Sequence, residues 1–384
     1  MIPEFPLLPF RLPAPDGSRV DLLIVAGEHS GDEHAARAVL EMQAKNPELK
    51  ICALAGPNVE AAGAQLLYDL TATSVVGIVE VLKNYSFFKT LFNETLRWIA
   101  EHRPRAVCFV DYPGLNLRLA AALRERGLSV KGGGNIKLFY YISPQIWAWK
   151  AKRRFTMARD LDALAVIFPF EVECYRDTDL PVEFVGHPFV APGHESPVVY
   201  DADGPVLLLP GSRKQAVAQI LPVLLGGLSA FGKSVPAVVL YPSEVIHEVI
   251  RAVSPPEHIK LVSTGGVVKA RAVLTSSGTM SLHCALAGIP GAIAYRTNLI
   301  TYLLARWWVK LDYIGIANLL LKKPMYPECI QYAATPEALA AELELCTADQ
   351  TRLQQTRDDQ ERLRGLLKQP ARVTIADWLA RWMI

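Results

Sequence analysis

The chain has 384 residues, of which 51% are apolar and 20% are charged, and this composition excludes a disordered protein. Its 40 Lys and Arg residues against 38 Asp and Glu residues give a net charge of +2, so no broad positive field is available to hold a nucleic acid. The six cysteines are scattered without a CxxC pair, which indicates reduced thiols. No secretion signal and no charge-free apolar run of about 18 residues is found, so we expect a cytoplasmic chain that does not span a bilayer.

Short apolar segments alternate with helix-length segments through the first half of the chain. Segments rich in Val, Ile, Leu and Phe at this spacing are typical of parallel strands buried on both faces. The pattern predicts an α/β domain over residues 1–188, with one helix that is capped by Ser86 and ended by Pro104. The expected strands are Val20–Ala26, Ile51–Leu54, Ala106–Val110, Lys137–Ile142, Ala163–Phe168 and Val182–Val185.

A second series of strands and helices follows a break in the pattern. After Pro188, roughly 15 residues rich in Pro, Gly and Asp predict a linker. We expect a second α/β domain over residues 189–355 and a charged helical tail over residues 356–384. Two doubly wound domains facing a cleft are the simplest architecture, because such sheets bind ligands beyond the carboxyl ends of their strands. The expected strands are Val206–Leu209, Ala237–Leu240, His258–Val262, Ala272–Thr275 and Gly291–Ala294.

Polar residues follow two expected strands of the first domain. The first strand runs through a glycine turn into Glu28, Ser30, Gly31 and Asp32 at the start of a helix, where free amides attract anions or hydroxyl-rich ligands. An ordinary turn in which Asp32 acts as a cap gives the same pattern. Asp111 directly follows another strand, and a carboxylate there can take a proton from a substrate hydroxyl. Its alternative role is to cap the next helix.

An aromatic and basic segment follows the strand that ends near Ile142. Trp147 and Trp149 precede Lys150 and Arg153. Tryptophan rings can stack on a sugar or acyl surface while cations contact a phosphate. Core aromatic residues followed by a solvated helix start explain the segment equally well.

Two glycine-containing loops in the second domain each join an expected strand to a helix. A glycine turn, helix amides and a fixed guanidinium suit a diphosphate whose negative charge grows as it leaves. Two such loops in one domain favour a nucleotide diphosphate, although turns made of small residues give the same pattern. The loop residues are Gly211, Ser212 and Arg213 in the first and Ser277, Gly278 and Thr279 in the second.

The sequence offers no clear metal or cofactor site. Three DxD pairs, at residues 160–162, 177–179 and 201–203, do not directly end an expected strand, so solvated capping carboxylates explain them better than metal ligands. No dinucleotide fingerprint or phosphate loop of the GxxxxGK type occurs. His187 has no second histidine at metal-ligand spacing. We therefore expect neither a catalytic metal nor a cofactor.

Taken in order, these segments resemble the lipid-A-disaccharide synthases, a family of inverting glycosyltransferases of the GT-B type. The resemblance extends over about Leu22 to Gln331, and the motifs are specific because they are collinear. They are Ala26-Gly27-Glu28 with Ser30-Gly31-Asp32, residues 77–82, Asp111 with Pro113 and Asn116, Tyr141 to Trp149, Pro169-Phe170-Glu171, Val185 to Pro188, Leu209 to Arg213, Ser277-Gly278-Thr279, Tyr295-Arg296, Asn318 and Gln331.

The resemblance implies a reaction and a division of labour between the domains. A 2,3-diacylglucosamine unit would pass from UDP to the 6-hydroxyl of 2,3-diacylglucosamine 1-phosphate, forming a β-1,6 linkage in lipid A biosynthesis. Inversion needs a single displacement, for which Asp111 is the candidate base. The implied acceptor side consists of Glu28, Ser30, Gly31, Asp32, Asn116 and Trp147. The implied donor side consists of Gly211, Ser212, Arg213, Ser277, Gly278, Thr279, His283, Arg296 and Asn318.

The family further implies C-terminal helices that pack back on the first domain, peripheral association with the inner face of the cytoplasmic membrane, and a homodimer as one possible assembly. Apolar segments at residues 75–92 and 299–321 could lie on a membrane or hold an acyl chain, or be core helices. His283 stands where the family usually has a glutamate for the ribose hydroxyls, so we expect altered donor binding. Two alternatives stay open: another GT-B UDP-N-acetylglucosamine transferase or epimerase, and a noncatalytic nucleotide-sugar-binding protein.

Overall fold

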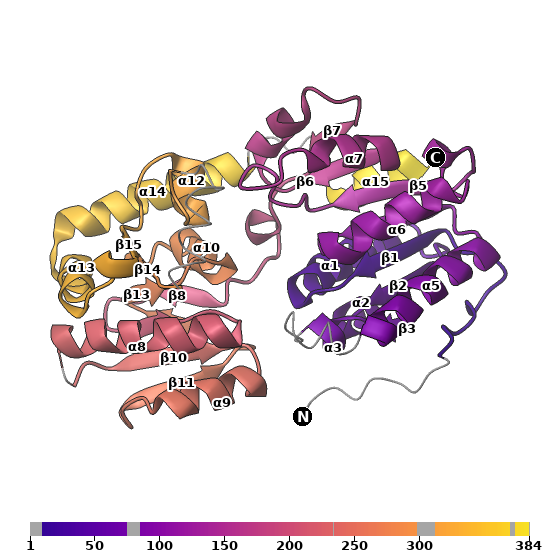
Figure 1. Ribbon diagram of the computed structural model, residues 1–384. Coiled ribbons are helices and arrows are strands. Elements are labelled where there is room, and N and C mark those ends of the chain that lie inside the picture. The colour runs from indigo at the N-terminus through magenta and orange to yellow at the C-terminus, as the bar shows by residue number, and fades with distance from the viewer. Residues whose placement is uncertain (1–9, 75–84, 233, 298–311, 369–372, 384) are drawn as a thin grey trace. The chain divides into compact units, whose positions relative to one another are not determined.

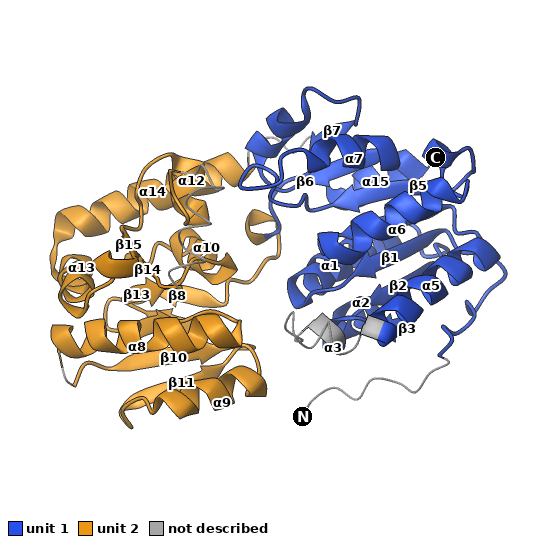
Figure 2. Cartoon of the chain, in the orientation of Figure 1, with its two compact units in different colours: residues 1–188, 369–384 blue, residues 189–368 orange. Residues whose placement is uncertain are grey.

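A computed structural model gives the structure of the chain and describes residues 10–74, 85–232, 234–297, 312–368 and 373–383. The chain divides into two compact units (Figure 2). Unit 1 consists of residues 1–188 and 369–384, and unit 2 consists of residues 189–368. Each unit has its own hydrophobic core, as expected for two separate α/β layers.

Unit 1 is built on a seven-stranded parallel sheet in the order β3-β2-β1-β4-β5-β6-β7 (Figure 1). Strands β1, β2 and β4 are buried over their whole length, which explains their continuous apolar sequences. The sequence pattern does not predict β3, because Gln, Tyr and Asp interrupt it. The strands are β1 (Leu22–Ala26), β2 (Ile51–Ala55), β3 (Gln65–Asp69), β4 (Ala106–Val110), β5 (Lys137–Tyr141), β6 (Ala163–Val166) and β7 (Val182–Phe184).

Helices cover both faces of this sheet. Right-handed crossovers that leave β1 and β4 in opposite directions place their helices on opposite faces, and accordingly α1 contacts α2 and α15, whereas α6 contacts α5 and α7. Trp378 of α15 packs edge-on against Phe139 of β5 with 5.6 Å between ring centroids. The expected return of C-terminal helices to the first domain is confirmed for α15. The elements are α1 (His29–Lys45), α2 (Pro57–Ala61), α3 (Thr71–Ser74), α5 (Tyr85–His102), α6 (Pro113–Glu125), η1 (Val130–Gly132), α7 (Arg153–Asp160), η2 (Pro169–Tyr175), η3 (Pro188–Val190, which continues into unit 2) and α15 (Ile375–Met383).

Unit 2 contains a six-stranded parallel sheet in the order β11-β10-β9-β13-β14-β15. Strands β8 and β12 form a separate two-stranded parallel sheet. The linker prediction is wrong for β8, because this short strand finds its partner about 70 residues farther along the chain, beyond the reach of a local pattern. The strands are β8 (Val198–Tyr200), β9 (Val206–Leu209), β10 (Ala237–Tyr241), β11 (Ile259–Ser263), β12 (Val268–Ala270), β13 (Ala272–Thr275), β14 (Gly291–Tyr295) and β15 (Glu328–Ile330).

The helices of unit 2 form two groups. Helix α8 packs against α9 and α13, whereas α10, α12 and α14 contact one another. Among the described residues, α8 is long and apolar enough to cross a membrane by length and composition alone, but its residues Val217, Ile220 and Leu221 belong to the core of unit 2. The elements are α8 (Lys214–Phe231), α9 (Glu244–Val253), α10 (Thr279–Leu286), α12 (Ile316–Leu321), η4 (Gln331–Ala333), α13 (Pro336–Ala348) and α14 (Gln350–Lys368).

The expected tail of residues 356–384 is divided between the two units. Its first part is the second half of α14, an unbroken helix that ends at Lys368 in unit 2. Leu363 and Leu367 are buried there, and Gln360 donates a hydrogen bond to the Leu286 carbonyl at 2.9 Å. The boundary therefore lies between residues 368 and 369, because α14 buries its apolar side in unit 2.

In each large sheet the order in which strands are added reverses once. The reversal lies between β1 and β4 in unit 1 and between β9 and β13 in unit 2. This order is that of a doubly wound sheet, as the sequence predicts. Such sheets bind ligands outside the carboxyl ends of the strands at the point of reversal. The loops after these four strands are the ones that carry the predicted loop residues of the site.

Candidate active site

Asp111 directly follows β4 in an unusual and firmly held turn. Asp111 and Tyr112 have φ values of 45° and 49°, a left-handed conformation that costs energy for residues other than glycine. The Asp111 amide donates to the Tyr141 carbonyl at 3.0 Å. Its own carbonyl accepts hydrogen bonds from Asn116 Nδ2 at 2.7 Å and from the Tyr140 hydroxyl at 2.6 Å. These three hydrogen bonds to the backbone of Asp111 fix the turn, and they thereby fix the Cα atom from which the carboxylate side chain extends.

The surroundings of Asp111 favour its neutral form. Burial raises the pKa of Asp111 to about 7, and the negative charge of Glu28 acts in the same direction, while a hydrogen bond from the Tyr112 backbone opposes the shift. Glu28 is exposed at the N-cap of α1. A carboxyl group with a pKa near neutrality can take up and release a proton at physiological pH, which suits a general base.

The turn after β1 is fitted to the ring of Tyr112. A Cβ atom added to Gly27 would overlap the Tyr112 ring, so only glycine leaves room for this contact. Gly27 therefore links the turn that precedes Glu28 with the turn that contains Asp111.

We expect Gly27→Ala to lower turnover by about 10- to 100-fold, because a displacement of about 1 Å at a reacting group has this effect. The added methyl group must push Tyr112 away and thereby disturb the adjacent Asp111. Gly365→Ala in α14 is the control, since a Cβ there meets nothing within 4 Å and alanine favours the helix. Steady-state kinetics and thermal unfolding of both variants check this, and wild-type turnover in Gly27→Ala would contradict it.

The predicted acceptor-side residues separate into two groups. Ser30 and Gly31 lie in the first turn of α1, next to Glu28, and Gly31 packs near Val110 at the end of β4. The structure therefore brings these residues to the end of the sheet where Asp111 lies.

Asp32 faces another element. This fully buried carboxylate accepts hydrogen bonds from the amides of Gly56 (2.8 Å), Asn58 (3.0 Å) and Val59 (3.2 Å), and from Asn58 Nδ2 (2.9 Å). These donors belong to the N-terminus of α2, whose amides have no partner inside the helix. Both of its oxygens are occupied in holding α2, so we infer a structural role for Asp32 in place of the expected acceptor contact.

Asn116 is likewise a positioning residue. Its side chain is fully buried in α6, and Nδ2 lies 3.3 Å from the carbonyls of both Val25 and Val110, besides its bond to Asp111. It thus ties the ends of β1 and β4 together beneath the turn. We therefore infer that Asn116 supports the Asp111 turn, in place of the expected direct contact with the acceptor.

Trp147 is hydrogen-bonded to Glu171, a residue to which the sequence pattern assigns no chemical role. The indole nitrogen of Trp147 donates to Glu171 Oε1 at 3.3 Å, and its ring packs edge-on against Phe170. Glu171 is 2% exposed, and its Oε2 accepts a bond from the Phe168 amide at 3.1 Å. Burial raises the pKa of Glu171 to about 8, and the nearby charge of Asp111 adds to the shift. Glu171 lies in η2, the element that follows β6, so its position is a weaker form of the signal that identifies Asp111 directly after β4.

The two glycine loops of unit 2 lie side by side. Strands β9 and β13 are neighbours, and the Ser276 amide donates to the Leu209 carbonyl at 2.8 Å. Gly211 has a φ of 110°, and a Cβ there would lie 3.2 Å from Ser276 Oγ. The expected pairing of the two loops therefore follows directly from the strand order.

Both loops lead into helix N-termini. Arg213 is the N-cap of α8, and Ser212 and Arg213 are exposed. Gly278 is the N-cap of α10, and Thr279 is its exposed first residue. The first amides of each helix have no intrahelical partner and favour an anion.

A hydrogen-bond network within unit 2 holds the loop that contains Ser277, Gly278 and Thr279. Ser277 Oγ donates to the Ile314 carbonyl at 2.9 Å, and the Glu328 carboxylate accepts bonds from the Ile314 amide at 3.0 Å and from Asn318 Nδ2 at 2.8 Å. The fully buried Asn318 also exchanges two bonds with the Tyr326 backbone, at 2.7 and 2.9 Å. Because its amide is occupied within unit 2, we infer that Asn318 is a scaffold residue in place of the expected donor contact.

The remaining donor-side candidates lie at different places in unit 2. Arg296 is exposed after β14, and the Gln331 side chain bonds to both the amide and the carbonyl of the adjacent Thr297. His283 is 7% exposed on α10. Its ring stacks on Phe189 with 3.7 Å between centroids. In the part of the chain that the structure describes, no group of three or more His, Cys, Asp or Glu residues could hold a metal ion.

Solved structures of similar fold cover most of this chain. The calicheamicin glycosyltransferase CalG4 has a TM-score of 0.54 at 15% identity, with 95% of this chain and 98% of that chain covered. A putative UDP-N-acetylglucosamine 2-epimerase from Listeria monocytogenes has a TM-score of 0.60 at 12% identity, with 88% and 90% covered. These likenesses confirm the expected GT-B fold.

Sequence comparison identifies the family. Residues 22–381 match the family model described as lipid-A-disaccharide synthetase. Lipid-A-disaccharide synthase 1 of Legionella pneumophila strain Paris is 36% identical over 336 residues, or 83% of this chain and 85% of the relative. The lipid-A-disaccharide synthase of Nitrosococcus oceani is 32% identical over 374 residues, or 92% and 94%. The chain therefore belongs to the lipid-A-disaccharide synthetase family.

Proposed function

We propose that this enzyme transfers 2,3-diacylglucosamine from UDP to the 6-hydroxyl of 2,3-diacylglucosamine 1-phosphate, giving a β-1,6-linked lipid A disaccharide 1-phosphate and UDP. Family membership supports the substrates. The observation that carries the chemistry is Asp111, held in a left-handed turn at the point of strand reversal with a pKa of about 7.

The reaction is a single displacement. The acceptor oxygen attacks C1 of the donor sugar as Asp111 takes the hydroxyl proton, and the bond from C1 to the diphosphate breaks, so UDP leaves with the electron pair. Burial raises the pKa of Glu171 to about 8, which favours its neutral form, so it holds Trp147 and adds little negative charge near the base. The amides that follow Gly211 and Gly278, together with Arg213, stabilise the departing diphosphate.

Arg213→Ala is expected to weaken UDP binding by about tenfold or more, the usual loss for a charge-assisted hydrogen bond to phosphate. The exposed Arg213 has no ion pair with a described carboxylate, so its removal should leave the fold intact. Arg251→Ala, on the exposed side of α9, is the matched control. Titration calorimetry measures both affinities, and equal values would remove Arg213 from the diphosphate site.

A product assay separates the candidate functions. The purified enzyme, given UDP-diacylglucosamine and diacylglucosamine 1-phosphate, is expected to release UDP and form the disaccharide. Turnover with unacylated donor alone would favour another sugar transferase, and conversion of UDP-N-acetylglucosamine without an acceptor would favour an epimerase, the activity named for the Listeria structure of similar fold. UDP binding without any turnover would leave a noncatalytic binding protein.

We further propose peripheral attachment to the anionic inner face of the cytoplasmic membrane through a surface formed by Trp149 and Phe155. Their side chains are 45% and 49% exposed. Lys150 Nζ lies 4.3 Å from the Trp149 ring centroid, and the Arg154 guanidinium lies 4.3 Å from that of Phe155. Exposed aromatic rings beside cations suit an interface with anionic lipids.

Co-sedimentation with vesicles tests this attachment. Trp149→Ser is expected to lower binding to anionic vesicles, whereas Tyr332→Ser, at a 79% exposed aromatic residue of unit 2, is expected to have no effect. Equal binding by both variants would exclude the surface. Of the apolar segments named from the sequence, residues 75–84 and 299–311 lie outside the described residues, and Phe87 and Leu91 belong to the core of unit 1. The homodimer stays a prediction, which sedimentation velocity can check.

A further inference from the structure

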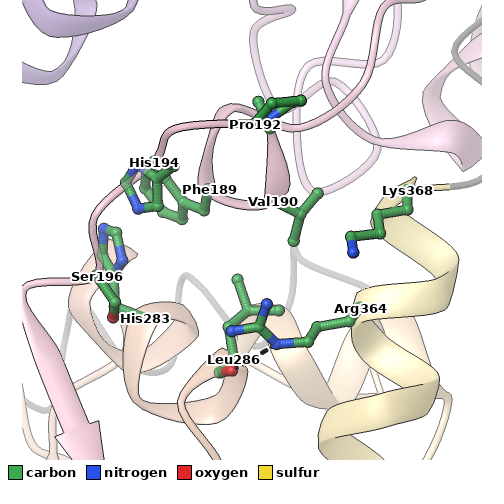
Figure 3. A pocket seen from close by; sticks show the side chains of 10 residues that line it. Phe189, Val190, Pro192, His194, Ser196, His283, Leu286, Arg364 and Lys368 are labelled. Carbon is green, nitrogen blue, oxygen red and sulfur yellow. Dashed lines mark hydrogen bonds between the residues drawn. The ribbon is translucent and has the colours of Figure 1, made fainter.

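Unit 2 contains a pocket of about 290 Å³ whose two cations, Arg364 and Lys368, have no role in the proposed reaction (Figure 3). Of the donor-side candidates named from the sequence, His283 alone is among its lining residues. It lies between residues 189–196, helix α10 and the last turns of α14. Arg364 and Lys368 lie on one side, and Phe189, His194 and His283 lie on the other. None of its ten lining residues is an Asp or Glu, so the charged side chains of the lining are cations.

Both cations reach from α14 toward the cavity in Figure 3. Arg364 Nε donates to the Leu286 carbonyl at 2.9 Å, which fixes the guanidinium and leaves its two terminal nitrogens for another partner. Lys368 follows one helical turn later, and like charges at this spacing repel each other. An anion placed between them would remove this repulsion.

No carboxylate of unit 2 serves as that anion. None of the ion pairs made by the described residues includes Arg364 or Lys368. The residues of unit 2 outside the described ranges, 233 and 298–311, contain no Asp or Glu. Another charged residue of α14 does have an ion-pair partner: Asp359 pairs with Lys323 at 2.5 Å. The helix dipole favours cations near a C-terminus, but it does not account for two that converge on one cavity.

The opposite wall is a stack of three rings. His283 lies 3.7 Å from Phe189 at an interplanar angle of 27°, and His194 stacks on both rings at 5.4 Å. Such a stack gives the cavity a rigid, flat wall. The volume corresponds to about ten water molecules at roughly 30 Å³ each, which is more than a single ion needs.

We propose that this pocket binds a phosphate group carried by a small organic molecule, as a phosphomonoester or a diphosphate. Arg364 and Lys368 neutralise the phosphate, with Arg364 able to offer two parallel donors. The ring wall packs against the organic part. The site is additional to residues 210–213 and 276–279, and it goes beyond the proposed reaction, which assigns no phosphate to α14.

The test uses the full-length enzyme with Arg213→Ala, which weakens the loop site. Inorganic phosphate, UDP and glucosamine 1-phosphate are titrated separately by calorimetry, so that the tightest ligand identifies the source of the phosphate. Lys368→Gln in this background is expected to weaken binding by about tenfold. Lys368 is exposed and makes no hydrogen bond to a described residue, so this variant should fold. Arg362→Gln, exposed on the same helix and absent from the pocket, is the control and should bind as the parent does.

The outcomes are distinct from those of the disaccharide assay, because binding rather than turnover is measured. Residual binding that Lys368→Gln and Arg364→Gln weaken, and that Arg362→Gln does not, supports the pocket. The proposal is overturned if none of the three compounds binds the Arg213→Ala enzyme at millimolar concentration. It is equally overturned if their affinities are the same with and without the two pocket cations.

Discussion

Asp111→Asn is expected to lower turnover by roughly 100-fold or more, the usual loss when a general base is removed. Asparagine keeps the size of the side chain, and the bonds that hold the turn involve the backbone of residue 111 rather than its carboxylate. The loss should therefore appear in kcat, with UDP affinity near that of the parent. Product formation at the parental rate would exclude Asp111 as the base.

The pH dependence of turnover by the parent enzyme is a second test of Asp111 as the base. The proposed base, Asp111, acts when ionised, so kcat/KM should rise about tenfold per pH unit below the pKa of about 7 and level off above it. Glu28→Gln removes a charge that raises this pKa, so it should move the rising limb to lower pH. If kcat/KM stayed constant between about pH 5 and about pH 8, Asp111 would not be the group that controls the rate.

The same pKa has a consequence for stability. The folded pKa of Asp111 lies above its ordinary value of 3.8, so the group favours folding most when it is protonated. Its contribution is fully present below pH 3.8 and is lost as pH rises toward about 7. Asp111→Asn should therefore stabilise the fold relative to the parent at pH 8 more than at acidic pH, which parallel thermal unfolding measures.

Position along the chain predicts the parts of the site that depend on strand ends. Asp111 and the loops of Gly211 and Gly278 come directly after apolar segments that form β4, β9 and β13. In a parallel sheet all carboxyl ends lie at one edge, so the order of residues along the chain is enough to group the residues of each domain. The sequence pattern does not predict the short strands β8 and β15, because three residues are too few to show a period.

Local pattern cannot reveal which polar side chains are already occupied. Asp32 and Asn318 both occur in motifs of the family, yet the partners of Asp32 come from residues 56–59 and those of Asn318 from residues 326–328. Glu171 is the opposite case: the sequence pattern gives it no chemical role, and its raised pKa arises from burial that only the folded chain creates. Family motifs thus contain scaffold residues and reacting residues alike, and hydrogen-bond partners separate them.

Asp32→Asn is the substitution that tests this separation most sharply. Oδ1 accepts two amides, from Gly56 and Val59, and Oδ2 accepts two donors of Asn58. Whichever way an asparagine amide is turned, its NH2 group faces two donors, and the buried groups left without an acceptor cost about 2 to 5 kcal/mol of unfolding free energy.

Denaturant unfolding and hydrogen exchange of the α2 amides measure this loss, and faster exchange should begin at Asn58 and Val59. Glu60→Gln, the same chemical change at an exposed position of α2, should stay within about 0.5 kcal/mol of the parent. Because the site at Asp111 lies at the end of another strand, an Asp32→Asn enzyme that remains folded at low temperature should keep much of its turnover. Full stability combined with lost turnover would instead return Asp32 to the acceptor side, and would mean that the bonds to α2 are weaker than their number indicates.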